Sequence, residues 1–270
     1  MTGVQLLEKL NKRERVYGTL ITSTSPAWIR RFRSIGLDFV FIDTEHTPMD
    51  RSMLALYCNV YKAMGIAPLT RIPTPSPYDA SIALDAGSNG ILGPYIEEAE
   101  QVRQLVGAVK YRPLKGKRLQ DLLCGRITLS PQEKDFFAKY NEGNFLFANI
   151  ESVAAMENLD DILEVEGLDG IIIGPQDLSI NLGVPEIYDS REFLEAVDFI
   201  IAKAKEHNKS VGNHFSAGIA PELIWAGKGM NIILHTQDQV VFTNNIRDEL
   251  NQFRALMGDP LIDNNGDPII

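Results

Sequence analysis

The sequence predicts an α/β protein of the (β/α)₈ TIM-barrel class, organised as a single domain of 270 residues. Short apolar runs rich in Val, Ile, Leu and Phe alternate with amphipathic stretches of helical length, which is typical of parallel βαβ units. Eight such units follow one another along the chain, the number that closes a barrel of this size. With 44% hydrophobic side chains, the chain can bury one large core.

The eight units have the following expected bounds. The predicted strands span residues 16–21, 39–42, 67–71, 90–92, 146–150, 170–173, 210–212 and 231–234. The predicted helices span residues 26–35, 51–64, 77–86, 96–109, 153–163, 192–207, 220–226 and 240–257. Residues 1–258 therefore form the expected barrel, and residues 259–270, which show no periodicity, a C-terminal tail. An open doubly wound sheet is the alternative, but Gly87, Gly90 and Gly93 lack the GxGxxG spacing of a dinucleotide site.

One connection departs from this rhythm, because about 30 residues separate the fourth predicted helix from the fifth strand, far more than an ordinary loop. It begins with a local excess of positive charge in an acidic chain: Lys110, Arg112, Lys115, Lys117 and Arg118. Such a segment can attract an anionic substrate. A solvated basic loop or an oligomer contact is the alternative, and the one we favour from sequence alone.

Composition and charge exclude several classes of protein. Lys and Arg number 26 against 36 Asp and Glu, and the resulting net charge of −10 disfavours binding to nucleic acid or to anionic membranes. No signal-peptide core or membrane-spanning run is present, so a soluble cytoplasmic protein is expected. Cys58 and Cys124 have neither disulfide-framework nor zinc-site spacing.

Polar side chains follow several predicted strands, where the active site of a (β/α)₈ barrel forms. Asp43, Glu45 and His46 follow the second strand, Arg71 ends the third, and Glu151 and Asp177 follow the fifth and sixth. Carboxylates without cysteine suit a hard divalent cation such as Mg²⁺ or Mn²⁺. Each residue alone has a structural interpretation, such as a helix cap or a barrel-end ion pair. Their joint occurrence at four strand ends favours a functional site.

The motifs at these strand ends, together with one at the end of the third predicted helix, resemble those of one family. They are Asp-Thr-Glu-His at 43–46, Thr-Arg-Ile-Pro at 70–73, Leu-Asp-Ala-Gly at 84–87, Asn-Ile-Glu at 149–151 and Gly-Pro-Gln-Asp-Leu-Ser at 174–179. Over roughly residues 18–250 the sequence resembles the HpcH/HpaI aldolases, metal-dependent class II pyruvate aldolases with a (β/α)₈ barrel. The resemblance implies reversible retro-aldol cleavage of a 4-hydroxy-2-oxo acid to pyruvate and an aldehyde, through a metal-stabilised enolate.

The resemblance also implies roles for individual residues. Glu151 and Asp177 would bind Mg²⁺, Mn²⁺ or Co²⁺, and Arg71 would contact the keto oxygen of the substrate. His46, oriented by Asp43, would handle the proton. The backbone amides of Gly174 and Gln176 and the side chain of Asn149 would contact pyruvate. Asp85 would reach into the site of a neighbouring subunit. A homo-oligomer, specifically a hexamer built from dimers that exchange their last helix, is implied as well.

Three departures from the family pattern bear on the substrate. Asn149 stands where the family usually has glutamine, residues 115–120 replace an Arg-Gly-x-Gly arch over the site, and residues 234–238 replace a Gly-x-Asp-Thr element. Two alternatives to the pyruvate aldolase therefore stay open. One is a lyase acting on acyl-CoA esters, or a related synthase using the same enolate, and the other is a degenerate barrel that only binds a ligand.

Overall fold

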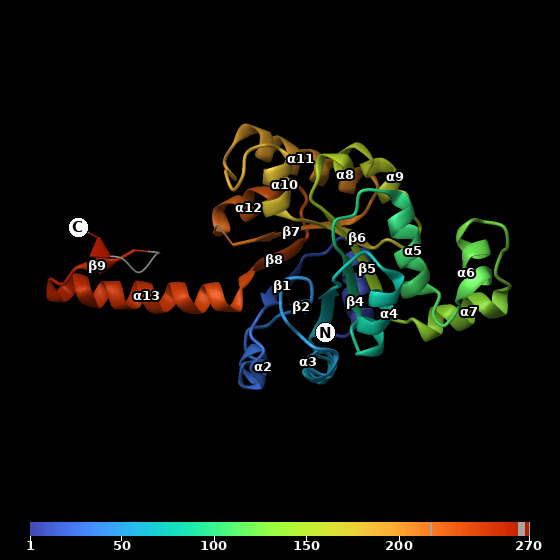
Figure 1. Ribbon diagram of the computed structural model, residues 1–270, viewed down its shortest axis with the longest axis horizontal. Helices are drawn as coiled ribbons and strands as arrows, with labels where there is room; N and C mark the ends of the chain where they lie inside the picture. The colour runs from blue at the N-terminus through green and yellow to red at the C-terminus, as the bar shows by residue number, and fades with distance from the viewer. Residues whose placement is uncertain (217, 264–267, 270) are drawn as a thin grey trace.

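The computed structural model describes residues 1–216, 218–263, 268 and 269, and its centre is a closed barrel of eight parallel strands (Figure 1). The strands are paired in sequence order, which confirms the (β/α)₈ prediction. They are β1 (Val16–Ile21), β2 (Phe39–Asp43), β3 (Ala67–Arg71), β4 (Gly90–Gly93), β5 (Phe145–Ile150), β6 (Gly170–Ile173), β7 (Ser210–Phe215) and β8 (Ile232–Gln237). The predicted ends of β7 and β8 are wrong by three residues each, because both strands continue through polar residues.

Helices surround the barrel and alternate with its strands. They are α1 (Gly3–Asn11), α2 (Pro26–Phe32), α3 (Arg51–Ala63), α4 (Pro77–Asp85), α5 (Ala99–Lys110), α6 (Gly116–Leu123), α7 (Pro131–Tyr140), α8 (Val153–Glu157), α9 (Leu159–Leu163), α10 (Pro175–Asn181), α11 (Arg191–Glu206), α12 (Ile219–Lys228) and α13 (Asp238–Met257). The single helix expected over 153–163 is divided at Asn158 into α8 and α9. Helix α1 was not predicted.

The interior of the barrel is a packed core, as this fold requires. Large side chains from alternate positions of the strands fill it, including Phe39, Phe145 and Phe147. A Cβ at Gly90 would collide with the ring of Phe145, so only glycine fits beside this phenylalanine. Helix α1 closes the N-terminal end of the barrel, where its buried Leu6 and Leu10 join the same cluster.

The basic stretch lies at the N-terminal end of the barrel, because the helix that follows a parallel strand runs back toward the start of the strands. Lys110, the last residue of α5, donates hydrogen bonds to the carbonyl of Asn144 (2.8 Å) and to Asp169 (2.7 Å), which precede β5 and β6. The other pairs in this region are Arg112 with Asp85, Lys117 with Asp121, and Arg118 with Glu133. Residues 115–120 therefore do not arch over the mouth of their own barrel, and most of their positive charge is paired with carboxylates.

Helix α13 extends away from the barrel as an arm, on the opposite side from α6 and α7 (Figure 1). Only Asp238 is buried among its residues. Within the predicted tail, β9 (Leu261–Ile262) and β10 (Pro268–Ile269) form a small antiparallel pair, whereas residues 264–267 and 270 of that prediction lie outside the described part of the chain. Among the described helices, none combines the length and the apolar character needed to cross a membrane.

Candidate active site at the C-terminal end of the barrel

A cavity of about 580 Å³ opens at the C-terminal ends of the strands. Strand ends on different sides of the barrel supply its polar lining. These residues are Thr22, Asp43, His46, Thr47, Arg71, Asn149, Glu151, Gln176, Asp177, Tyr188, His214, Ser216 and Gln237. The structure therefore brings together the predicted residues of the second, third, fifth and sixth strand ends.

An ion-pair network fixes the guanidinium of Arg71 at one side of this cavity. Asp43 accepts two hydrogen bonds from it, at 2.9 Å from Nε and 2.7 Å from the terminal nitrogen, because β2 and β3 pair these two residues in register. Glu45 lies 3.1 Å from the same Nε. Burial alone would raise the pKa of the Asp43 carboxyl, but the hydrogen bonds and charge of Arg71 hold that pKa below its usual range. Arg71 is thus a rigid, fully charged cation.

The structure gives Asp43 other hydrogen-bond partners than the predicted His46. Both Asp43 oxygens face Arg71, and one of them also accepts a hydrogen bond from the Glu45 amide. The His46 ring instead lies 3.6 Å from Glu45 and is largely exposed at the rim of the cavity. Glu45, which links His46 to Arg71, therefore has the orienting position that the sequence motif had assigned to Asp43.

On the β5 and β6 side, the buried carboxylate of Glu151 is held by its neighbours. One oxygen accepts a hydrogen bond from the Tyr95 amide at 2.7 Å, and the other accepts one from the side chain of Asn149. The Asn149 amide thus positions Glu151 instead of standing free for a substrate. A Cβ at Gly174 would collide with the Glu151 carboxylate, so glycine at this position makes room for it. Burial raises the pKa of Glu151, and the two hydrogen bonds offset only part of that effect.

Asp177, in the first turn of α10, is the second carboxylate of this side, and its charge further disfavours ionisation of Glu151. Two neighbouring carboxylates are suited to bind a cation between them. Among the described residues, no group of three or more His, Cys, Asp or Glu is arranged to hold a metal ion. With Glu151 and Asp177 as ligands, the protein would supply two oxygen ligands and leave the other positions to substrate and water, as Mg²⁺ commonly accepts.

Two predicted backbone contacts have different outcomes. The Gly174 amide, predicted to receive a substrate carboxylate, donates to the Ile150 carbonyl at 3.2 Å in this structure. The Gln176 amide belongs to the first turn of α10, where backbone N–H groups have no intrahelical partner. Of the two amides, only that of Gln176 can therefore meet an anion in the cavity.

Asp85 does not reach this cavity. It is the last residue of α4, at the N-terminal end of the barrel, with its side chain 71% exposed and paired with Arg112. Any role for Asp85 in catalysis therefore requires the cavity of another subunit.

Sequence reasoning missed His214, which lines the cavity from β7. Its position fell outside the predicted strand, which ended at residue 212. Alternation along β7 would have been the signal, because residues two apart, such as Gly212 and His214, face the same side of a strand.

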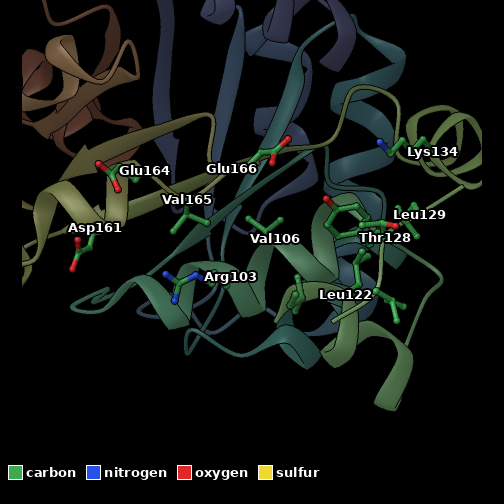
Figure 2. A pocket seen from close by; sticks show the side chains of 13 residues that line it. Arg103, Val106, Leu122, Thr128, Leu129, Lys134, Asp161, Glu164, Val165 and Glu166 are labelled. Atoms are coloured by element: carbon green, nitrogen blue, oxygen red, sulfur yellow. The ribbon is translucent and has the colours of Figure 1, made fainter. Parts of the chain in front are cut away.

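A second cavity, of about 540 Å³, lies outside the barrel between α5, α9 and the segment that carries α6 and α7 (Figure 2). Figure 2 shows Arg103, Asp161 and Glu164 toward one end of it and Lys134 toward the other. Cations and carboxylates are mixed along its walls, so it favours no ligand of one charge.

Comparisons with known proteins agree with this geometry. The family model described as HpcH/HpaI aldolase/citrate lyase matches residues 17–241. The chain is 33% identical over 258 residues to a 2-keto-3-deoxy-L-rhamnonate aldolase of Salmonella typhi, covering 92% of each chain. An HpcH/HpaI aldolase structure from Desulfitobacterium hafniense DCB-2 superposes with a TM-score of 0.79 at 26% identity, over 92% of this chain and 96% of that one. The structure of citrate synthase SbnG gives 0.80 at 28% identity, over 94% and 99%.

Proposed function

Because this chain belongs to the HpcH/HpaI aldolase/citrate lyase family and is a carbon–carbon lyase of the class II aldolase type, we propose that it cleaves 4-hydroxy-2-oxo acids reversibly to pyruvate and an aldehyde. The observation that carries this proposal is the arrangement of opposite charges across one cavity. Arg71, held by Asp43 and Glu45, lines the cavity together with Glu151 and Asp177. Such a site offers positive charge to an oxo acid and oxygen ligands to a cation.

The chemistry follows from where charge develops. In the cleavage direction, the C4 hydroxyl loses its proton, the C3–C4 bond breaks, and its electron pair moves to the C2 oxygen to give the enolate of pyruvate. We assign Arg71 to that oxygen, because a fixed cation lowers the energy of charge that forms in the transition state. The exposed ring of His46, which is next to Glu45, transfers the proton.

A divalent cation, Mg²⁺, Mn²⁺ or Co²⁺, bound by Glu151 and Asp177 would supply further positive charge to the same oxo acid. Asn149 and the Tyr95 amide hold the Glu151 carboxylate in place by hydrogen bonds. We assign the Gln176 amide to the substrate carboxylate, since first-turn amides bind anions.

Exchange of the pyruvate methyl protons in D₂O tests this function without knowledge of the aldehyde. We expect exchange that needs Mg²⁺ or Mn²⁺, stops with EDTA, and is lost in His46→Ala. Glu151→Ala and Asp177→Ala should lose both exchange and cation affinity. The control is Glu164→Gln, which changes an exposed carboxylate of the second cavity and should behave as wild type. No exchange with any divalent cation would contradict the proposal and favour a barrel that only binds a ligand.

The aldehyde partner is best sought among hydroxylated compounds, because the relative at 33% identity is named for a deoxy-sugar 2-keto acid. The likeness to a citrate synthase supports a second candidate function. In that function, the same enolate chemistry serves a synthase or an acyl-CoA lyase. Binding of a CoA ester, measured by calorimetry beside binding of pyruvate, distinguishes the two. Pyruvate binding without CoA ester binding supports the aldolase.

We further propose a homo-oligomer, a hexamer built from dimers in which α13 is exchanged between subunits. An apolar groove of about 550 Å³ between α2, β1, β8 and the start of α13 supports the exchange; it is lined by Trp28, Phe32, Ile35, Ile233 and Phe242. Beyond it, Phe253, Leu256 and Met257 of the arm are largely exposed. Apolar side chains of that size are stabilised by burial against a partner. In such an assembly, Asp85 is available to the cavity of a neighbouring subunit.

Sedimentation equilibrium tests this assembly. The variant Phe253→Asp places a charge in the exposed apolar stripe and should shift the protein toward smaller species, whereas Glu249→Gln on the same helix should not. If both variants sediment as the wild type does, exchange of α13 is contradicted.

A further inference from the structure

We propose that His214 recognises a hydroxyl group of the substrate, accepting its hydrogen bond on the ring atom Nε2. This inference rests on the proposed aldolase function but concerns a different question, namely which oxo acids or aldehydes the site prefers. The group that His214 recognises is a neutral hydrogen-bond donor.

His214 lies at the level in the barrel where the reaction takes place. Its neighbour Asn213 pairs in register with Ile173, which directly precedes Gly174. The His214 ring lines the same cavity as Arg71 and Glu151. Phe41 contacts both residues: its face carries the Arg71 guanidinium at 5.5 Å, and the His214 ring meets it edge to face at 5.7 Å.

One ring nitrogen of His214 has no partner within the described protein. Its Nε2 is buried and makes no hydrogen bond, although a buried polar atom without a partner is costly. Ligand groups that enter the cavity can satisfy it, because the residue lines that space. An orphaned ring atom beside a charged, substrate-sized cavity therefore points to a ligand contact.

The backbone of Thr236 acts on the other ring nitrogen. Its hydrogen bond with the ring raises the pKa of His214, and because Nε2 has no partner, we assign that bond, and with it the proton, to Nδ1. Thr236 is a buried β-branched residue with φ of +51°, a conformation that such residues rarely adopt. Its carbonyl also accepts a hydrogen bond from the Thr19 hydroxyl at 3.3 Å. With the proton on Nδ1, Nε2 presents a lone pair.

The charge state of the ring determines what can bind it. Burial, with the nearby charge of Arg71, lowers the pKa of His214 to about 4, so the ring is neutral at physiological pH. A neutral acceptor does not bind a carboxylate or a carbonyl, which are acceptors themselves. A hydroxyl donates to Nε2 and, through its own oxygen, stays compatible with the cation of Arg71. The site therefore favours hydroxylated over deoxygenated substrates.

The test compares substrates that differ by one hydroxyl, in the wild type and in two variants. Glycolaldehyde against acetaldehyde tests a hydroxyl on the aldehyde part, and hydroxypyruvate against pyruvate tests one on the oxo acid part. His214→Leu removes the acceptor, and we expect at least one hydroxylated-to-deoxy ratio of kcat/KM to fall about tenfold. His214→Gln, whose side-chain carbonyl accepts a hydrogen bond, should restore most of that ratio.

Nitrogen-15 spectra of the imidazole rings provide a readout that does not need turnover. The signal of His214 is identified by its loss in His214→Gln. We expect the tautomer protonated on Nδ1 throughout pH 5–8, and a shift of Nε2 when hydroxypyruvate is added that exceeds the shift with pyruvate.

The possible outcomes separate the two proposals. Exchange of pyruvate protons together with unchanged substrate ratios, or a proton found on Nε2, overturns the role of His214 and leaves the aldolase standing. Absence of exchange together with a selective Nε2 shift overturns the aldolase and supports recognition of a hydroxyl. If neither ligand changes any signal, both proposals fail.

Discussion

The buried pair of Asp43 and Arg71 makes the sharpest prediction about stability. The side chains are 3% and 13% exposed, and two hydrogen bonds join them. Asp43→Asn keeps the shape but removes the charge and turns one acceptor into a donor facing the guanidinium. Removing one partner of a buried pair costs about 3–5 kcal/mol. Glu45 keeps a contact with the guanidinium at 3.1 Å, so we expect about 2–3 kcal/mol, near one lost charged hydrogen bond.

Urea unfolding at a fixed protein concentration, followed by circular dichroism, measures this cost. Glu45→Gln is the matched control, because that carboxylate is more exposed and its loss should cost about 1 kcal/mol or less. Equal midpoints for the two variants would refute the reasoning. Pyruvate proton exchange should also fall more than tenfold in Asp43→Asn, because a shifted guanidinium no longer meets the enolate oxygen.

The pH dependence of the same difference has a definite sign. The pKa of Asp43 is lowered in the folded protein, so its contribution to stability is present above the usual value of 3.8 and is lost as the pH falls through the lowered pKa. The stability difference between wild type and Asp43→Asn should therefore be constant near pH 7 and shrink only below about pH 4. A difference that already shrinks between pH 7 and 5 would contradict the pairing.

Two further variants test other contacts of the mouth. Gly174→Ala places a Cβ against the Glu151 carboxylate and should weaken cation binding in calorimetry at least tenfold, whereas Gly227→Ala, which has open space around it, should not. Asp238→Ala removes the acceptor of the Thr22 and Ser23 amides, at 3.0 Å each, and should lower the free energy of unfolding by about 2 kcal/mol. Its control, Asp198→Ala, breaks only the exposed pair with Lys228, and an equal loss in both variants would contradict the anchoring role of Asp238.

The barrel was predictable because its strands are apolar runs separated by amphipathic helices. The residues Asp43, Arg71, Glu151 and Asp177 were predictable because the fold sends all strand ends to one mouth. The pairing of these side chains was not predictable, because it depends on the register of β2 and β3. That register aligns Asp43 with Arg71, and His46 lies near Glu45 instead. Register is set by packing between strands that are distant in sequence, and a local motif does not contain it.

Two other parts of the molecule were missed for local reasons. Polar residues inside β7 and β8 ended the predicted strands early, which hid His214 and Thr236. Helix α1 is short, but it carries a capping box between Thr2 and Gln5 and the buried pair Leu6 and Leu10. Both signals are visible in the sequence once a helix is expected to close the N-terminal end of the barrel.

Charged side chains are arranged differently at the two ends of the barrel in this acidic chain. At the N-terminal end, Lys110, Arg112 and Arg118 are paired with carboxylates, so the basic stretch contributes little net field. At the C-terminal end, Asp43 and Glu45 surround Arg71 and leave Glu151 and Asp177 without a direct cationic partner among the described residues. An oxo acid approaching this mouth meets net negative charge until a divalent cation binds. Cation binding should therefore precede and strengthen pyruvate binding, and a cation bound by Glu151 and Asp177 would then serve substrate capture as well as the reaction.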